Sequence, residues 1–359
     1  MAKPVFNFDV AGLPPSIFGL VMATGVVSLA AAGAEYSSLA IGLFSLNAPL
    51  YLVLFALFLL RMATAPAAVA ADFLDHARAP GFFTMVAAPC VLGSQFVLLA
   101  DWPGVGIVLL GIGLLHWGVF TYLMLPSLMT AREKPPAEQG LSGAWLLLVV
   151  ATQAVSVLTG LILQRLHPTP EWAVFGALAF WLVGSMIYIW IISQIFNRIL
   201  FQPVGPSDLT PPYWINMGAM AISTLAGAVL VGLAGQSPLL RELLPFLKGM
   251  ILLFWATATW WIPILLALGV WRHLVRHFPL TYDHGYWAAV FPLGMYTVCT
   301  ETMIRTLHLP LLAPIATAFV WVAIFAWVAT FIGFVHQLIV PPARPLEAQQ
   351  NGWIPTAKK

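Results

Sequence analysis

The sequence predicts an all-α integral membrane protein in which ten transmembrane helices pair into five helical hairpins around a central pore. Three observations lead to this fold class. Hydrophobic residues make up 61% of the 359 residues and charged residues only 8%, against roughly 25% charged residues in an ordinary soluble domain. Apolar runs long enough to cross a bilayer recur along the whole chain. Alternate runs resemble one another, which indicates an internal repeat of the kind found in transporters.

The composition also excludes several classes of protein. A soluble enzyme cannot cover its surface with so few charges. The net charge of +2 is too small to indicate nucleic acid or another polyanionic partner. Cys90 and Cys299 each lie inside an apolar run, so we interpret them as buried apolar residues rather than as a disulfide or a metal pair. The sequence predicts no cofactor, no metal site and no enzymatic activity.

Ten apolar segments are long enough to span a bilayer, which takes about 20 residues. Prolines and glycines separate most of them. The first segment begins with Pro14-Pro15-Ser16 and has no basic stretch before it, so we interpret it as a spanning helix rather than a signal peptide. The segments cover residues 14–34, 37–60, 81–100, 103–130, 143–164, 171–196, 213–235, 243–270, 286–306 and 310–340.

The basic residues predict the orientation of these segments. With ten spans, eleven of the 15 Lys and Arg residues fall on the side that holds both termini, and four fall on the other. The positive-inside rule therefore predicts that both termini lie in the cytoplasm, with the helices in the plasma or inner membrane. Residues 1–13 are the predicted cytoplasmic N-terminus, 341–359 a disordered cytoplasmic tail, and 62–80 a loop with a short amphipathic helix.

The odd-numbered segments carry the internal repeat. Each opens with an aromatic or small polar residue and continues through small and hydroxyl residues. They start near residues 16, 82, 144, 213 and 286, so each interval of 62 to 73 residues has the length of one helical hairpin. The even-numbered segments are bulkier, as in Tyr51–Leu60 and Phe319–Phe334. We predict a ring of odd-numbered helices inside and even-numbered helices outside; chance similarity between apolar segments is the alternative interpretation.

The inner helices supply the candidate pore residues. Close helix packing requires small residues, and this explains most of the Gly, Ala, Ser and Thr residues in the inner helices. The functional interpretation is a pore wall formed by side-chain hydroxyls and by backbone groups that are freed where a proline breaks a helix. None of the inner helices has an acidic residue in its middle, so the wall suits anions better than cations. The candidates for lining the pore or bending its helices are Thr24, Gly25, Pro89, Thr152, Asn216, Pro292 and Thr297.

Ionisable residues inside the segments are candidates for proton coupling. Glu301 and Arg305 are four residues apart, which favours a structural ion pair on one helix face over a proton-carrying carboxylate. His116 lies in the middle of segment four and is either a hydrogen-bonded histidine or a protonation switch. Phe291 stands beside Pro292; from its residue type alone it is a packing phenylalanine in a chain with 23 of them, and an apolar gate is the alternative.

Two local motifs resemble the tellurite-resistance/dicarboxylate transporter family, whose relatives include malate permeases, sulfite efflux pumps and plant slow anion channels. Residues 18–28, FGLVMATGVVS, are similar to the first helix of that family, and residues 286–294, YWAAVFPLG, to its ninth helix. The resemblance covers most of residues 10–340. It implies a five-hairpin ring around a pore in each protomer of a homotrimer, and a gating role for Phe291.

Together these observations predict transport of small anions, either a C4-dicarboxylate such as malate or an oxyanion such as sulfite or tellurite, through a phenylalanine-gated pore. Two alternatives remain open. One is a proton-coupled anion carrier that uses Glu301 or His116. The other, from a different class, is an integral-membrane enzyme or haem protein, which would need facing axial histidines; only His116 and His336 lie within predicted helices.

Overall fold

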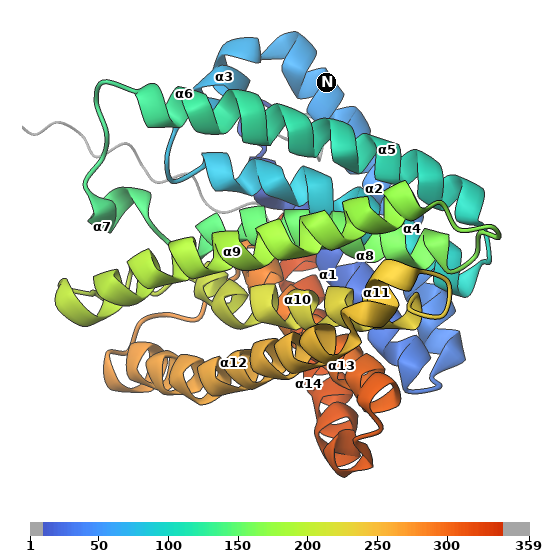
Figure 1. Cartoon of the computed structure of the whole chain (residues 1–359). Coiled ribbons are helices and arrows are strands. Elements are labelled where there is room, and N and C mark those ends of the chain that lie inside the picture. Colours follow the sequence, from blue (N-terminus) through green and yellow to red (C-terminus); the bar gives the residue numbers. More distant parts are fainter. Residues whose placement is uncertain (1–9, 340–359) are drawn as a thin grey trace, which may run out of the picture.

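The computed structural model describes residues 10–339, and within that range it contains helices and turns but no strand. The predicted all-α membrane fold is therefore confirmed. Long helices lie side by side in one bundle, with the short helices α7 (Ala137–Gly140) and α11 (Pro238–Glu242) at its opposite ends (Figure 1). The predicted tail, 341–359, and most of the predicted N-terminal segment, 1–13, fall outside the described residues.

Five buried helices correspond to the odd-numbered segments and form an inner ring. Each contacts the next in the cyclic order α1, α4, α8, α10, α13 and back to α1. Small residues permit this packing: a Cβ atom on Gly218 would lie 2.7 Å from Cγ of Pro292, so α10 and α13 meet at a glycine. The five inner helices are α1 (Gly19–Gly33), α4 (Thr84–Leu99), α8 (Leu147–Leu163), α10 (Ile215–Gly232) and α13 (Trp287–Leu307).

Five longer helices surround this ring. Each packs against the inner helix that precedes it in the chain, which gives the five hairpins that the internal repeat predicts. Their outward faces carry exposed leucine, phenylalanine and tryptophan side chains, as expected of surfaces in contact with lipid. The outer helices are α2 (Ser37–Thr64), α5 (Pro103–Val119) with its continuation α6 (Leu125–Thr130), α9 (Glu171–Phe201), α12 (Leu244–Val270) and α14 (Ala313–Ile339).

A polar contact joins each outer helix to the inner helix of the following hairpin. In four of these five junctions the donor is a tryptophan indole N–H, and in the fifth it is a side-chain amide. Such bonds fix the rotation of one helix relative to the next, because a hydrogen bond is directional, whereas apolar packing alone allows several rotations. The five bonds are Asn47 to Gln95 (2.7 Å), Trp117 to Thr152 (2.9 Å), Trp181 to the Ser223 carbonyl (2.9 Å), Trp255 to Thr300 (2.9 Å) and Trp327 to Thr24 (3.0 Å).

Within the described range, nine helices are long and apolar enough to cross a bilayer. The helix α13 is not among them, because threonines and the charged residues Glu301 and Arg305 make it less apolar. It nevertheless occupies the fifth place in the inner ring. The predicted count of ten spanning helices therefore stays a prediction. The ten helices nevertheless pack as five hairpins in a ring within the described residues.

The predicted helix in the 62–80 loop is α3 (Pro66–Leu74), and it carries a buried ionic network. Asp72 is 3% exposed and accepts from Arg61 Nη2 at 2.6 Å and from Arg78 Nε at 2.9 Å. Arg61, at the end of α2, also donates through Nε to the carbonyl of Ala11 at 3.0 Å. The network therefore ties α2, α3 and the chain before α1 together at one end of the bundle.

Candidate functional site

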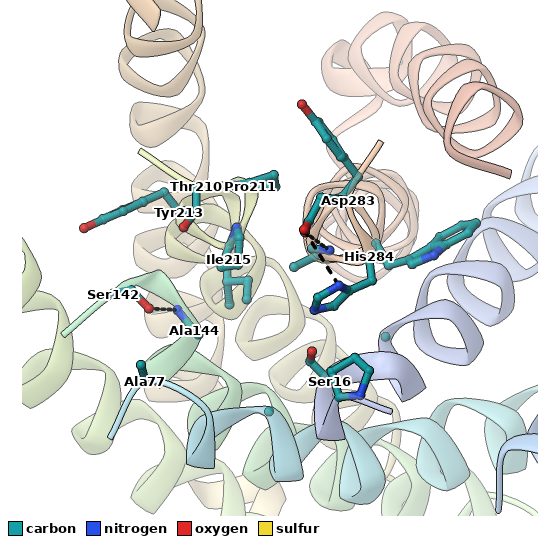
Figure 2. A pocket seen from close by; sticks show the side chains of 18 of the residues that line it. Ser16, Ala77, Ser142, Ala144, Thr210, Pro211, Tyr213, Ile215, Asp283 and His284 are labelled. Atoms are coloured by element: carbon teal, nitrogen blue, oxygen red, sulfur yellow. Dashed lines mark hydrogen bonds and ion pairs between the residues drawn. The ribbon is translucent and has the colours of Figure 1, made fainter. Parts of the chain in front are cut away.

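A cavity of about 840 Å³ opens at the N-terminal ends of the five inner helices, and we call it the N-side cavity. Every inner helix begins there with a 3₁₀ turn, and the five turns contact one another in the same cyclic order as the helices. Residues of all five turns surround the cavity (Figure 2). The turns are η1 (Pro15–Phe18), η2 (Ala79–Phe83), η4 (Gly143–Leu146), η5 (Pro211–Trp214) and η7 (His284–Tyr286).

Glycine is required where consecutive turns touch. A Cβ atom on Gly81 would lie 2.9 Å from the backbone nitrogen of Ser16, and one on Gly143 would lie 2.4 Å from the carbonyl oxygen of Pro212. Backbone atoms cannot move aside as a side chain can. These two glycines therefore allow the ring of turns to close tightly around the cavity.

The arrangement of the helices gives the N-side cavity an electrostatic bias. The N-terminus of a helix carries unpaired backbone N–H groups and a partial positive charge, which favour anions. Side chains cap only two of the five turns: Ser142 Oγ accepts from Ala144 N at 3.3 Å in η4, and Asp283 Oδ1 accepts from Gly285 N at 2.6 Å in η7. Five converging N-termini thus favour anions at this mouth of the ring.

Three arginines also line the N-side cavity, each held in place by a partner. Arg78 pairs with Asp72, and Arg198 Nη2 lies 3.6 Å from Asp208 Oδ2. Arg272 Nη1 donates to the carbonyl of Leu209 at 2.7 Å. In the sequence, these arginines indicate only the orientation of the helices. Their positions near segment ends were the one signal of a shared site, and only the folded ring shows that they line the same cavity.

A second cavity of about 420 Å³ lies deeper in the ring, and we call it the C-side cavity. The same five inner helices line it, each through residues nearer its C-terminus. On α13, Phe291 lines the N-side cavity and Met295 the C-side cavity. Four residues of helix correspond to about 6 Å, so the two cavities end about one helical turn apart on α13.

Phe291 lies at this separation and is 1% exposed. It is the last α13 residue to line the N-side cavity. Met22 is likewise the last residue of the neighbouring helix α1 to line it. Its neighbour Pro292 lies against Gly218 of α10, away from both linings. On α13 a large apolar ring therefore forms the inner end of the N-side lining, one turn before the C-side lining begins; on the other four inner helices the two linings are six or seven residues apart.

The polar residues predicted to line the pore lie elsewhere. The hydroxyls of Thr24 and Thr152 accept hydrogen bonds from tryptophans of outer helices, and Thr297 Oγ1 donates to the Leu293 carbonyl at 3.2 Å. None of these threonines lines either cavity. That these three threonines line the pore therefore stays a prediction, while other hydroxyl residues, among them Ser16, Ser142 and Thr302, do line the cavities.

The remaining candidates are also outside the linings of the two cavities. Asn216 is fully buried, and its side-chain amide has no hydrogen-bond partner among the described residues. Gly25 makes room for Val91: a Cβ atom there would lie 2.6 Å from Cγ1 of Val91. Pro89 lies inside α4, one residue before Cys90, which does line the C-side cavity.

The two proton-coupling candidates differ in position. Glu301 lines the C-side cavity together with Arg305, and Gly33 leaves the space that its carboxylate occupies. The favoured Glu301–Arg305 pair is not formed: the ion pairs within 4 Å in residues 10–339 do not include it. His116 instead contacts the Met85 carbonyl through Nδ1 at 3.2 Å and stacks on Phe120, outside both cavities.

The chain is similar in sequence to several membrane proteins. The chain is 40% identical to an uncharacterized membrane protein of Mycobacterium tuberculosis over 152 residues, which is 42% of this chain and 77% of that protein. It is 26% identical to two uncharacterized transporters of Methanocaldococcus jannaschii, over 89% and 94% of this chain and 91% and 97% of theirs. The sequence pattern of the SLAC1 family, described as voltage-dependent anion channels, matches residues 12–335. Because that match extends over nearly the whole ring, the chain belongs to the SLAC1 family of membrane anion channels and transporters.

Proposed function

We propose that the protein lets small anions cross the membrane through the ring of five inner helices, with Phe291 as the gate. One observation carries the proposal. Two cavities are lined by the same five helices and come within about one turn of each other on α13, where the buried Phe291 is the last residue of the N-side lining. An apolar side chain at such a constriction blocks ions because water cannot fill the passage. Movement of Phe291 would join the two cavities into one path.

The anion preference rests on the helix N-termini and on weak binding. Five N-termini attract negative charge to the N-side cavity, and the three acidic residues in its lining are matched by three arginines, so the side chains add no net negative charge there. The arginines at the mouth are already paired or hydrogen-bonded, so they hold a passing anion less tightly than free guanidinium groups would. We propose C4-dicarboxylates such as malate and oxyanions such as sulfite or tellurite as substrates.

The N-side cavity is proposed to face the cytoplasm across the plasma or inner membrane. Arg78, Arg198 and Arg272 line it, whereas Arg305 lines the C-side cavity, in agreement with the positive-inside rule. Both termini are proposed to be cytoplasmic. Each protomer would hold its own pore, within the homotrimer that the family resemblance implies.

Purified protein in liposomes tests the proposed function. We expect uptake of malate, sulfite, tellurite, nitrate or chloride to exceed uptake by protein-free liposomes, because the helix N-termini admit anions. Uptake of potassium or sodium should stay at the level of protein-free liposomes. Protein that unfolds cooperatively on heating but passes none of these anions, even with Phe291 replaced by alanine, contradicts the proposal.

One observation favours a proton-coupled carrier as the second candidate. The carboxylate of Glu301 lines the C-side cavity without an ion-pair partner within 4 Å, where it can exchange a proton with water in the path. The lack of contact between His116 and either cavity makes it the weaker candidate.

The two candidates differ in how a proton gradient acts. For passive permeation we expect the current to reverse at the equilibrium potential of the anion at every pH gradient, and Glu301→Gln to leave that potential unchanged. A reversal potential that follows the pH gradient, and loses that dependence in Glu301→Gln, supports the carrier instead. Thr302→Val, beside Glu301 in the same lining, is the matched control.

A further inference from the structure

We propose that the carboxylate of Asp283 determines how well the pore distinguishes doubly from singly charged anions. This inference rests on the proposed function, because it concerns the mouth through which the anion passes. Asp283 lines the N-side cavity at the start of the helix that carries Phe291. Figure 2 shows it facing the same space as Ser16, Ser142 and Thr210.

Asp283 differs from the arginines of this cavity in its surroundings, and it shares the cavity with two further acidic residues, Asp208, which faces Arg198, and the exposed Glu138. Arg78 and Arg198 face carboxylates, at 2.9 Å and 3.6 Å. The ionic neighbour of Asp283 in the described part of the chain is His284, whose Nδ1 is 3.8 Å from Asp283 Oδ2. The Asp283 side chain is 59% exposed. Its negative charge therefore acts on the solvent of the cavity rather than being cancelled by a fixed cation.

The carboxylate also occupies a position that suits an anion. Asp283 Oδ1 accepts from the backbone N–H of Gly285, at the first turn leading into α13. In the equivalent turn leading into α8, the neutral hydroxyl of Ser142 makes the corresponding bond to Ala144 N. The ring thus holds one anionic and one neutral cap at corresponding places, which provides a matched pair of sites for substitution.

The expected effect follows from Coulomb's law. A unit charge about 8 Å from the path changes the occupancy of a monovalent anion roughly twofold in water, and that of a divalent anion by the square of this factor. Low-dielectric walls enlarge both effects. Asp283 therefore disfavours malate or sulfite dianions more than chloride or nitrate.

Two substitutions test this in opposite directions. Asp283→Asn keeps a good cap and removes the charge; Ser142→Asp keeps a good cap and adds one. We expect the permeability ratio of malate to chloride to rise roughly two- to fivefold in Asp283→Asn and to fall by a similar factor in Ser142→Asp. The ratio is measured from reversal potentials in planar bilayers with malate on one side and chloride on the other, at an alkaline pH where malate is fully ionised.

The valence dependence separates this role from a structural one. Loss of a cap or of folded protein lowers both permeabilities together, and thermal unfolding of the purified variants monitors folding. Anion currents with an unchanged malate-to-chloride ratio in both variants overturn the inference and leave the proposed function standing. Absence of anion current in the unsubstituted protein and in both variants, also when each carries Phe291→Ala, overturns the proposed function itself, and the inference with it.

Discussion

Replacement of Phe291 by alanine is expected to raise anion flux on the order of tenfold or more. The side chain is 1% exposed and ends the α13 lining of the N-side cavity, about one turn before the C-side lining begins. Without the aromatic ring, water can enter the constriction and connect the two cavities. Single-channel or macroscopic currents in planar bilayers or oocytes measure the change.

The control for this variant is Phe18→Ala. Phe18 is also fully buried, but it packs edge-on against Tyr51 and Phe58 and lines neither cavity. Both substitutions remove a buried ring and cost about 3–5 kcal/mol of stability, so only a gating role makes their currents differ. Wild-type current from well-expressed Phe291→Ala protein would show that Phe291 is a packing residue.

Replacement of Asp72 by asparagine is expected to destabilise the protein by roughly 3–5 kcal/mol. Asp72 and Arg61 form a pair whose side chains are 4% and 2% exposed, so removing the carboxylate leaves the Arg61 guanidinium buried without a counter-charge. The thermal unfolding temperature of protein in detergent measures the loss. We expect a large drop.

An exposed ion pair provides the matched control. Arg165 and Asp101 are joined at 3.0 Å, but their side chains are 42% and 76% exposed. Exposed pairs contribute about 0–1 kcal/mol because water solvates both charges. Asp101→Asn should therefore unfold within a few degrees of the wild type, and equal drops in the two variants would mean that burial of the Arg61–Asp72 pair has no special weight.

Much of the fold could be predicted from the sequence because a bilayer imposes simple rules. The length of each apolar run predicts a spanning segment. The odd-numbered segments were predicted to start near residues 16, 82, 144, 213 and 286. These starts fall at the 3₁₀ turns that open the five inner helices. The alternation of small-residue and bulky segments separated inner from outer helices for the same reason: only small side chains allow five helices to meet around one axis.

The residues of the site were harder to predict, because a periodic pattern does not specify the rotation of a helix. Thr24 and Thr152 were expected to face the pore, yet they face tryptophans of outer helices. A hydroxyl inside a membrane can bond across helices as readily as it can line a passage. Arg198 and Asp283 were missed as cavity residues because only the closed ring brings their segments to one mouth.

The hydrogen bond from Trp327 to Thr24 joins residues 303 positions apart. It lies where α13 and α14 complete the circle against α1, the first helix of the ring to be synthesised. Four hairpins without the last one leave this circle open, because α13 is the helix that contacts both α10 and α1. Closure of the ring therefore requires contacts that span most of the described residues, and no shorter part of the chain encloses the space within it.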